Sequence, residues 1–350
     1  MKHKLKMILR QVWARFLYHT GLHILLGKLM PQRLTILTSH CVTHKTNAFL
    51  PQDMKIEGRR LEALLDSFGK HYDWVSVGDG WSRLQSAQGR SMVALSMDDG
   101  YHDNLEALLP LLQKRGLSAT VYLESRPLDG QSLNWTHKFF WLLARMDHKQ
   151  LVERYLAHSQ DPLAKQRLAE VLAAGGDLNY TLKKVLKYEA DQADVEASLT
   201  AAFVEAGGDE PALCRELYLS WDDAKALHAG GVELGGHTVH HWVLSGLDAA
   251  GQQQEVSGGQ QRLATQLEAS RSFAYPFGRH WDWNQDSSDA VRSAGFATAA
   301  TTHAGTNTRS TDPMRLSRWM IDDNTPMHLM ATELCGGFEL LRKFGLDLSE

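Results

Sequence analysis

Residues 92–100 of this 350-residue chain read Met-Val-Ala-Leu-Ser-Met-Asp-Asp-Gly, an apolar run that ends in two adjacent carboxylates and a glycine. The run is typical of a buried β-strand, whose successive side chains point to opposite faces. Asp98 and Asp99 can therefore share one site only where the chain turns, and Gly100 permits such a turn. One carboxylate is then free to bind a metal ion while the other accepts a proton. The alternative is an acidic helix N-terminus, in which these carboxylates and Asp103 complement the helix dipole.

Similar short apolar or β-branched runs alternate with amphipathic stretches on both sides of this strand. That rhythm is typical of parallel strands joined by helices, and it predicts an α/β barrel. The predicted strands are 35–40, 92–97, 119–123, 232–235, 272–276, 297–302 and 315–321. The predicted helices between them are 57–72, 104–115, 221–229, 252–268 and 286–294.

One interval, residues 129–216, breaks the rhythm because it shows only helical patterns, so we expect an all-helical insertion there. Its predicted helices are 139–158, 163–173 and 192–206, with the glycine pairs 175–176 and 207–208 separating them. The barrel is assigned to residues 34–128 and 217–325. Within residues 326–350, a last helix over 327–344 is expected to close the barrel.

Composition narrows the class of protein. With 37 basic and 41 acidic residues the formal net charge is -4, which offers no excess of positive potential for a phosphate backbone, so we expect no nucleic-acid partner. The cysteines Cys41, Cys214 and Cys335 lie far apart and form no CxxC pair. They predict neither a disulfide framework nor a thiolate zinc site, and they favour a cytoplasmic protein.

The first 33 residues form a basic, amphipathic helical segment. Its longest uncharged run, 16–27, is shorter than the roughly 20 apolar residues that span a bilayer, and no small-residue cleavage site of a secretory signal follows it. We therefore expect neither a membrane span nor a signal peptide. The segment is expected to dock on the domain, and the alternative is peripheral contact with the inner face of a membrane through residues 1–30. Its apolar positions at helical spacing are Leu5, Ile8, Leu9, Val12, Phe16 and Leu17.

A second chemical motif, Gly235-Gly236-His237-Thr238-Val239-His240-His241, follows the predicted strand that contains Val232. His237 and His241 are four residues apart, so on a helical turn both imidazoles would share one face, as a divalent metal requires. With Asp99 they would make a set of two histidines and one carboxylate. Such a set leaves coordination positions open for water and substrate, which is typical of a catalytic zinc site. His240 would point elsewhere.

The two motifs resemble the first two motifs of the polysaccharide deacetylases, the NodB-homology or carbohydrate esterase family 4 superfamily. Tyr275-Pro276-Phe277-Gly278 resembles the third motif, and Leu219-Ser220-Trp221 precedes the histidines as in the family. The resemblance covers residues 34–128 and 217–325. It implies a distorted (β/α)7 barrel and metal-dependent hydrolysis of the N-acyl amide of an N-acetylated sugar. The expected metal is Zn²⁺, with Ni, Co or Fe as alternatives.

The resemblance also implies roles for individual residues. Asp98 matches the general base, and the Phe277 N–H matches a donor to the oxyanion. Tyr275 belongs to the same motif and is assigned with it to the substrate side of the site. Trp281 and Trp283 are expected either to contact the sugar or to be packed in the loop, and Trp281 is the preferred candidate. The implied metal ligands are Asp99, His237 and His241.

Two features depart from the family pattern. The arginine that normally precedes the proline motif is replaced by Ala274, so another group must hold Asp98. Arg315 and Arg318 on the last predicted strand are the candidates, the alternative for each being a surface arginine, and we favour Arg318. The C-terminal Leu-x-His motif, whose histidine acts as general acid, is also missing. Thr38-Ser39-His40 resembles the Tyr-His element of exopolysaccharide-linked members, which makes His40 the expected acid.

Histidine at the barrel mouth has other interpretations. His40 would otherwise be a core histidine, and His303, at the end of another strand, is the reserve candidate for the acid.

The overall expectation is a cytoplasmic deacetylase acting on an N-acylated sugar, oligosaccharide or lipid-linked glycan in polysaccharide or envelope biosynthesis. The alternatives are a catalytically silent glycan-binding protein on the same barrel, or a hydrolase of another C–N amide bond such as a deformylase.

Overall fold

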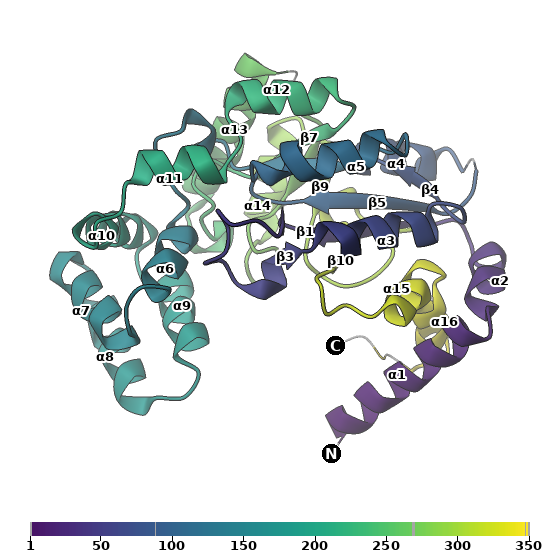
Figure 1. Cartoon of the computed structure of the whole chain (residues 1–350), viewed down its shortest axis with the longest axis horizontal. Helices are drawn as coiled ribbons and strands as arrows, with labels where there is room; N and C mark the ends of the chain where they lie inside the picture. Colours follow the sequence, from purple (N-terminus) through teal and green to yellow (C-terminus); the bar gives the residue numbers. More distant parts are fainter. Residues whose placement is uncertain (1, 88, 268–269, 347, 349–350) are drawn as a thin grey trace.

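A nearly closed barrel of parallel strands forms the centre of the molecule (Figure 1). The computed structural model describes residues 2–87, 89–267, 270–346 and 348. A parallel bridge between Ala300 and Leu316 brings the two ends of the sheet together. The barrel predicted from the sequence is confirmed, and every predicted strand is present. In spatial order the strands are β10 (Arg318–Met320), β1 (Leu34–Ser39), β5 (Met92–Met97), β6 (Thr120–Leu123), β7 (Glu233–Gly236), β8 (Ser272–Ala274) and β9 (Thr298–Ala300).

The central strands are buried on both faces. Along β5, Met92 and Ala94 pack inside the barrel with Tyr122, whereas Val93 and Leu95 pack against the outer helices. This alternation follows from the two-residue period of a strand. It explains why β1, β5 and β6 are continuous buried runs rather than alternating ones.

Helices surround the barrel much as the sequence predicts. The segment expected as one helix over 104–115 instead begins with a π-type turn, Asn104–Leu108. The sequence did not predict β4 (Asp73–Val75), which pairs with β5, or the small sheet of β2 (Cys41–Val42) and β3 (Lys55–Ile56). Strands of two or three residues are too short to show a period. The surrounding helices are α3 (Gly58–Phe68), α4 (Val77–Gln85), α5 (Leu109–Gln113), α12 (Trp221–Ala229), α13 (Ala249–Gln266) and α14 (Gln285–Ser293).

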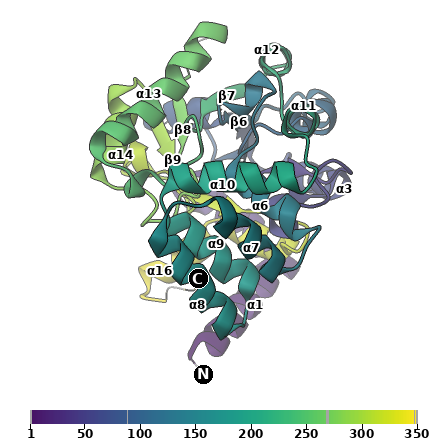
Figure 2. The ribbon, with the colours of Figure 1, turned by 90° about the vertical axis from the view of Figure 1, so that its left-hand side faces the viewer.

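The described residues between β6 and β7 fold into a cluster of helices, which faces the viewer in Figure 2. The predicted helix over 139–158 is two helices, because Asp147 and Gln150 form a capping box that starts a new one. Each helix from α7 to α11 begins at an aspartate whose carboxylate accepts a backbone N–H. The helices are α6 (Trp135–Leu143), α7 (His148–His158), α8 (Pro162–Ala174), α9 (Leu178–Tyr188), α10 (Gln192–Glu205) and α11 (Glu210–Leu217).

The apolar core of this insertion extends onto the barrel. It includes Cys41, which follows β1, and Tyr101, which follows β5. Tyr218, directly after α11, belongs to the same cluster. The insertion therefore packs on the ends of the strands from which the chain enters its loops, the end at which barrel enzymes hold their sites.

The two ends of the chain pack together on the side of the barrel away from the insertion (Figure 1). The last predicted helix is broken by Gly336, whose φ of 74° is left-handed, and barrel closure comes from the β9 bridge instead. Trp13 Nε1 donates to the carbonyl of Gly337 at 3.1 Å. None of the described helices is long and apolar enough to cross a membrane. The helices are α1 (Lys2–His19), α2 (Leu22–Leu29), α15 (Met327–Leu334) and α16 (Gly337–Lys343).

The close packing of β6 against β7 predicts a stability effect. A Cβ on Gly235 would lie 2.2 Å from Cδ1 of the buried Tyr122. We expect Gly235→Ala to lower the free energy of unfolding by about 2 kcal/mol, because the ring must move in a packed core. The control is Gly246→Ala, where a Cβ meets nothing within 4 Å. Denaturant titration of both variants is the measurement, and equal stabilities would contradict the expectation.

Candidate active site

The two carboxylates after β5 are brought to one place by a left-handed turn. Asp99 has φ 71° and Gly100 has φ 74°, a conformation that non-glycine residues rarely adopt. Asp98 and Asp99 are 3% and 2% exposed. The strained turn allows adjacent side chains to face the same site, as the sequence analysis required.

Asp99 lies between the two histidines predicted as ligands. Its Oδ1 is 3.4 Å from His237 Nε2 and 3.4 Å from His241 Nε2. The three potential ligand atoms all lie within 4.8 Å of one another, and all three side chains are buried. The expected helical turn is wrong: residues 237–241 form a loop, in which Thr238 and His241 have positive φ values of 66° and 56°.

The donor atoms of this set fit a divalent cation. Asp99 Oδ1 and His237 Nε2 are buried without a hydrogen-bond partner among the described residues, although buried polar atoms are normally paired. His237 Nδ1 bonds to the Ala274 carbonyl at 2.7 Å, which fixes the ring with Nε2 toward Asp99, as in many metal-binding histidines. Two imidazole nitrogens and a carboxylate oxygen suit Zn²⁺ and related ions.

The protonation states of Asp99 and His241 agree with metal binding. Burial alone would raise the pKa of Asp99, but the adjacent His237 and the other neighbouring histidines hold that pKa well below its usual value. Burial lowers the pKa of His241 well below its usual value. Burial also acts to lower the pKa of His237, but Asp99 and Asp98 outweigh it and raise that pKa. An anionic carboxylate beside a neutral His241 is the form that binds a cation.

Asp98 forms a buried, bidentate ion pair with Arg318. The Arg318 Nη1 to Asp98 Oδ1 distance is 2.6 Å and the Nη2 to Oδ2 distance is 2.9 Å. Arg318 Nε also donates to the Thr301 carbonyl at 2.8 Å, which holds the guanidinium in place. Burial raises the pKa of Asp98, but Arg318 outweighs it and lowers that pKa. Of the two arginines considered, Arg315 lies elsewhere: it is half-exposed and pairs with Asp312.

The structure distinguishes between the two candidates for the general acid, His40 and His303. His40 is partly buried at the end of β1, and its Nδ1 is buried with no hydrogen-bond partner among the described residues. The Asp98 N–H donates at 3.1 Å to the carbonyl of Ser39, the residue before His40, so the chain reaches His40 at the point where β5 ends in Asp98. His303 is exposed, and its backbone carbonyl accepts the Arg318 N–H. The structure therefore brings His40 to the carboxylates, and the side chain of His303 is not brought there.

In the third motif, Phe277 lies at the site, whereas Tyr275 lies in the core. Phe277 has φ 60°, and its ring centroid is 4.6 Å from that of His241. Its N–H has no hydrogen-bond acceptor among the described residues. Tyr275 is buried, and its hydroxyl donates to the Met314 carbonyl at 3.1 Å, so it supports the motif from within the core. Trp281 is 48% exposed and its Nε1 donates to Tyr188 of the insertion.

A buried hydrogen-bond chain reaches Asp99 from the insertion, and the sequence analysis missed it. The Asn134 N–H donates to the Tyr218 hydroxyl at 3.2 Å, and the Tyr218 hydroxyl bonds to His137 Nδ1. His137 Nε2 lies 2.5 Å from the Tyr101 hydroxyl, which donates to Asp99 Oδ2 at 3.2 Å. Burial lowers the pKa of His137 to about 4. The imidazole is therefore neutral at pH 7, with its one proton on Nε2 directed to Tyr101.

The insertion also places a cation beside the third motif. Lys187 Nζ lies 3.6 Å from the centroid of the Phe277 ring and 3.1 Å from Asp282 Oδ1. Burial lowers the pKa of Lys187 to about 8, against the effect of Asp282. The ammonium therefore remains mostly charged at neutral pH. No sequence signal linked α9 to the loop after β8, because the contact joins distant parts of the chain.

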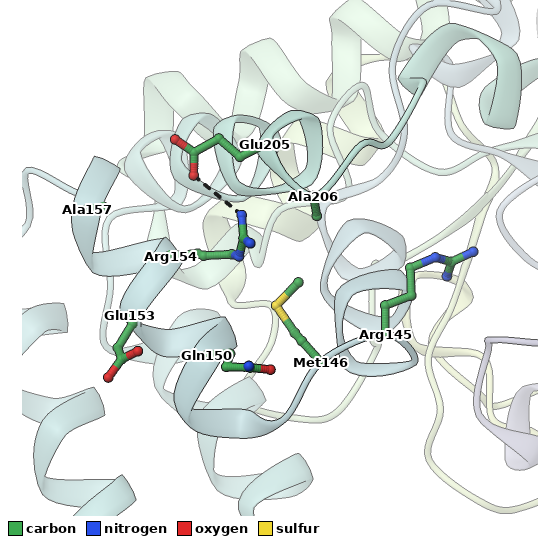
Figure 3. Close-up of a pocket in the computed structure, with 8 residues that line it drawn as sticks. All are labelled: Arg145, Met146, Gln150, Glu153, Arg154, Ala157, Glu205 and Ala206. Atoms are coloured by element: carbon green, nitrogen blue, oxygen red, sulfur yellow. Dashed lines mark ion pairs between the residues drawn. The ribbon is translucent and has the colours of Figure 1, made fainter.

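One cavity lies away from the carboxylates. It has a volume of about 670 Å³ and lies on the insertion (Figure 3). An ion pair between Arg154 and Glu205 crosses one side of it. None of the residues that line the cavity is a histidine, and its two carboxylates, Glu153 and Glu205, are exposed, so we assign the chemistry to the barrel. The residues that line the cavity are Arg145, Met146, Gln150, Glu153, Arg154, Ala157, Glu205 and Ala206.

Comparison with known proteins agrees with this geometry. Residues 189–299 match the family described as Polysaccharide deacetylase, a span that holds His237, His241 and Phe277 but not Asp98 or Asp99. The family resemblance predicted from the motifs is thereby confirmed. No curated protein sequence matches the chain.

Solved structures share the fold at low sequence identity. The deacetylase PplD from Streptococcus pyogenes, in complex with acetate, superposes with a TM-score of 0.56 at 16% identity, over 87% of this chain and 99% of that one. IcaB from Ammonifex degensii gives 0.52 at 16% identity, over 87% and 98%. The de-N-acetylase from Aggregatibacter actinomycetemcomitans gives 0.54 at 16%, over 85% and 98%. The distorted barrel is therefore common to all of them.

The hydrogen-bond chain predicts an effect on metal affinity. We expect Tyr101→Phe to weaken Zn²⁺ binding about tenfold, because groups that orient a metal ligand contribute that much or more to affinity. The matched control is Tyr155→Phe, which removes a buried hydroxyl that donates to Asp194 in the insertion at 3.1 Å. Competition with a chromophoric chelator measures both dissociation constants. Equal affinity in Tyr101→Phe and wild type would show that the chain does not orient Asp99.

Proposed function

We propose that this chain is a divalent-metal-dependent hydrolase that removes the acetyl group from an N-acetylated sugar. One observation carries the proposal. The potential metal ligands Asp99, His237 and His241 lie together, next to a second carboxylate, Asp98, which is anionic and held in place by Arg318. The match of residues 189–299 to the polysaccharide deacetylases supports the reaction class.

Asp99, His237 and His241 would hold the metal, with Zn²⁺ expected and Ni, Co or Fe as alternatives. When bound, such an ion acidifies a water molecule and polarises the acyl carbonyl. Asp98 acts as the general base that takes the proton of the attacking water. Arg318 keeps Asp98 ionised and oriented, because its fork holds both carboxylate oxygens.

Two further groups complete the proposed reaction. The Phe277 N–H donates to the oxyanion that develops on the acyl carbonyl, and its freedom from other acceptors supports this role. His40 protonates the leaving amine, and its place directly after Ser39, whose carbonyl accepts the Asp98 N–H, supports this role. The water oxygen forms a bond to the acyl carbon as Asp98 takes up its proton, and the C–N bond then breaks as His40 donates a proton to the leaving nitrogen, so the amide and one water give a free amine and an acid.

The substrate class follows from the same site. We propose an N-acylated sugar, oligosaccharide or lipid-linked glycan used in polysaccharide or envelope biosynthesis, with Trp281 at the exposed rim as a surface for a sugar face. A cytoplasmic location is part of the proposal because the three cysteines are all free and buried. Two alternatives are tested alongside: a silent glycan-binding protein, and a hydrolase of another amide such as a deformylase.

Substitution of the base tests the reaction. We expect the chain supplied with Zn²⁺ to release acetate from N-acetylglucosamine oligomers, and Asp98→Asn to lower kcat about 100-fold or more, because general-base catalysis is lost. The control is Asp103→Asn, since burial raises the pKa of Asp103 to about 7 and the amide resembles its protonated form.

The released acid separates the alternatives. Mass spectrometry identifies acetate from N-acetyl and formate from N-formyl substrates in matched reactions. Binding of the oligomers without any acid release would contradict the hydrolase and favour a glycan-binding protein. Formate release alone would replace the deacetylase with a deformylase.

A further inference from the structure

The helix α1 has two apolar faces, and only one of them is covered by the protein. Ala14 and Leu17 are 0% and 3% exposed where α1 packs on α15 and α16. A contiguous apolar face that the protein itself leaves exposed normally marks an interaction site, so the second face requires a covering of its own. The exposed side chains of this face are Leu5, Ile8, Leu9, Val12 and Phe16.

The next helix, α2, extends this surface. None of its residues is buried, and Leu29 is 73% exposed. More than half of the large exposed apolar side chains among the described residues belong to α1 and α2, and this concentration exceeds the scattered exposure that is normal on a soluble protein. We call these side chains the N-terminal apolar surface: Leu5, Met7, Ile8, Leu9, Val12, Phe16, Leu22, Ile24, Leu25 and Leu29.

The charges around this surface have one sign. Residues 1–30 contain six Lys or Arg and no Asp or Glu, although the whole chain has a formal net charge of -4. Lys6 is partly exposed, and Arg15 and Lys28 are exposed. An apolar face bordered by basic side chains matches the interface of a bilayer that contains anionic lipid, where lipid tails meet phosphate headgroups.

We propose that α1 and α2 bind the surface of an anionic phospholipid bilayer, with the N-terminal apolar surface inserted at the headgroup level and the basic side chains on the phosphates. A second copy of the chain fits this face less well, because a self-complementary contact would place like charges together without an acidic counterpart. The proposal goes beyond the proposed reaction and does not depend on it.

The position of the surface is compatible with an accessible site. Figure 1 places α1 and α2 on the side of the barrel away from the insertion, whose core packs at the end of the barrel that holds the carboxylates. Contact with a bilayer through these helices therefore leaves the barrel mouth uncovered. The 18 residues of α1 lie along the bilayer plane in this arrangement rather than across it.

Vesicle sedimentation of the full chain tests the proposal. We expect binding to vesicles of phosphatidylglycerol and phosphatidylcholine, and weaker binding as salt is raised or phosphatidylglycerol is omitted. The double variant Val12→Glu/Leu25→Glu should lower the partition coefficient at least about tenfold. Its matched control is Leu163→Glu/Val204→Glu, which changes apolar side chains of similar exposure on the insertion and should bind as wild type does.

A charge variant makes the test independent of the apolar substitutions. Lys6→Gln/Arg15→Gln/Lys28→Gln should lower binding to the anionic vesicles on the order of 100-fold. No vesicle binding by wild type, or equal losses in the insertion control, would overturn the proposal. Concentration-dependent dimers in ultracentrifugation that Val12→Glu/Leu25→Glu abolishes would overturn it in favour of a second copy. Acetate release from a soluble substrate should be unchanged in these variants, so failure here leaves the proposed reaction standing.

Discussion

Two adjacent carboxylates buried at the end of one strand are the constraint on which the rest of this structure depends. A buried charge is unfavourable unless it is paired. Asp98 is compensated by Arg318, whose side chain reaches over β1 and also donates to Thr38 at 3.1 Å. That single guanidinium ties β10, β1 and β5 together at the barrel mouth. Asp99 has no lysine or arginine within ion-pair distance among the described residues, only histidines and a tyrosine hydroxyl, so its charge calls for an external cation.

The insertion is part of the site rather than an appendage. It supplies His137, which is neutral and bonded to Tyr101, and Tyr101 bonds to the metal-ligand candidate Asp99. It also supplies Lys187, which rests on the Phe277 ring. The strained positions Asp99, Thr238, His241 and Phe277 are all at this site, and strain of this kind persists only where the surroundings hold it. The insertion packs on that strained region, which gives its buried core a role in the geometry of the site.

Local patterns were enough to predict much of this molecule. The seven barrel strands could be predicted, and so could the two motifs that contain Asp98 and His241. A buried strand and the loop that follows it are consecutive in the sequence, so a local pattern shows both. Arg318 could also be predicted as the partner of Asp98, because the last predicted strand contains only two arginines. Local patterns could not show long-range contacts, very short strands or irregular backbone conformations. The His137 and Tyr218 contacts join helices to a distant turn, β4 is three residues long, and the loop at His237 uses left-handed residues where a helical turn was expected. Gly336, with its φ of 74°, divides the last helix, and a Cβ there would lie 3.2 Å from Cζ of the distant Arg33.

The most direct test of the metal centre is the metal content of the purified chain, measured by elemental analysis after loading with Zn²⁺ and removal of unbound ion. The geometry predicts about one ion per chain in wild type. Asp99→Ala and His237→Ala should lose it, whereas His240→Ala, whose ring bonds to Glu255 instead, should keep it. A wild-type chain that holds no metal, or an Asp99→Ala chain that holds as much as wild type, would contradict the assignment of Asp99, His237 and His241 as the metal site.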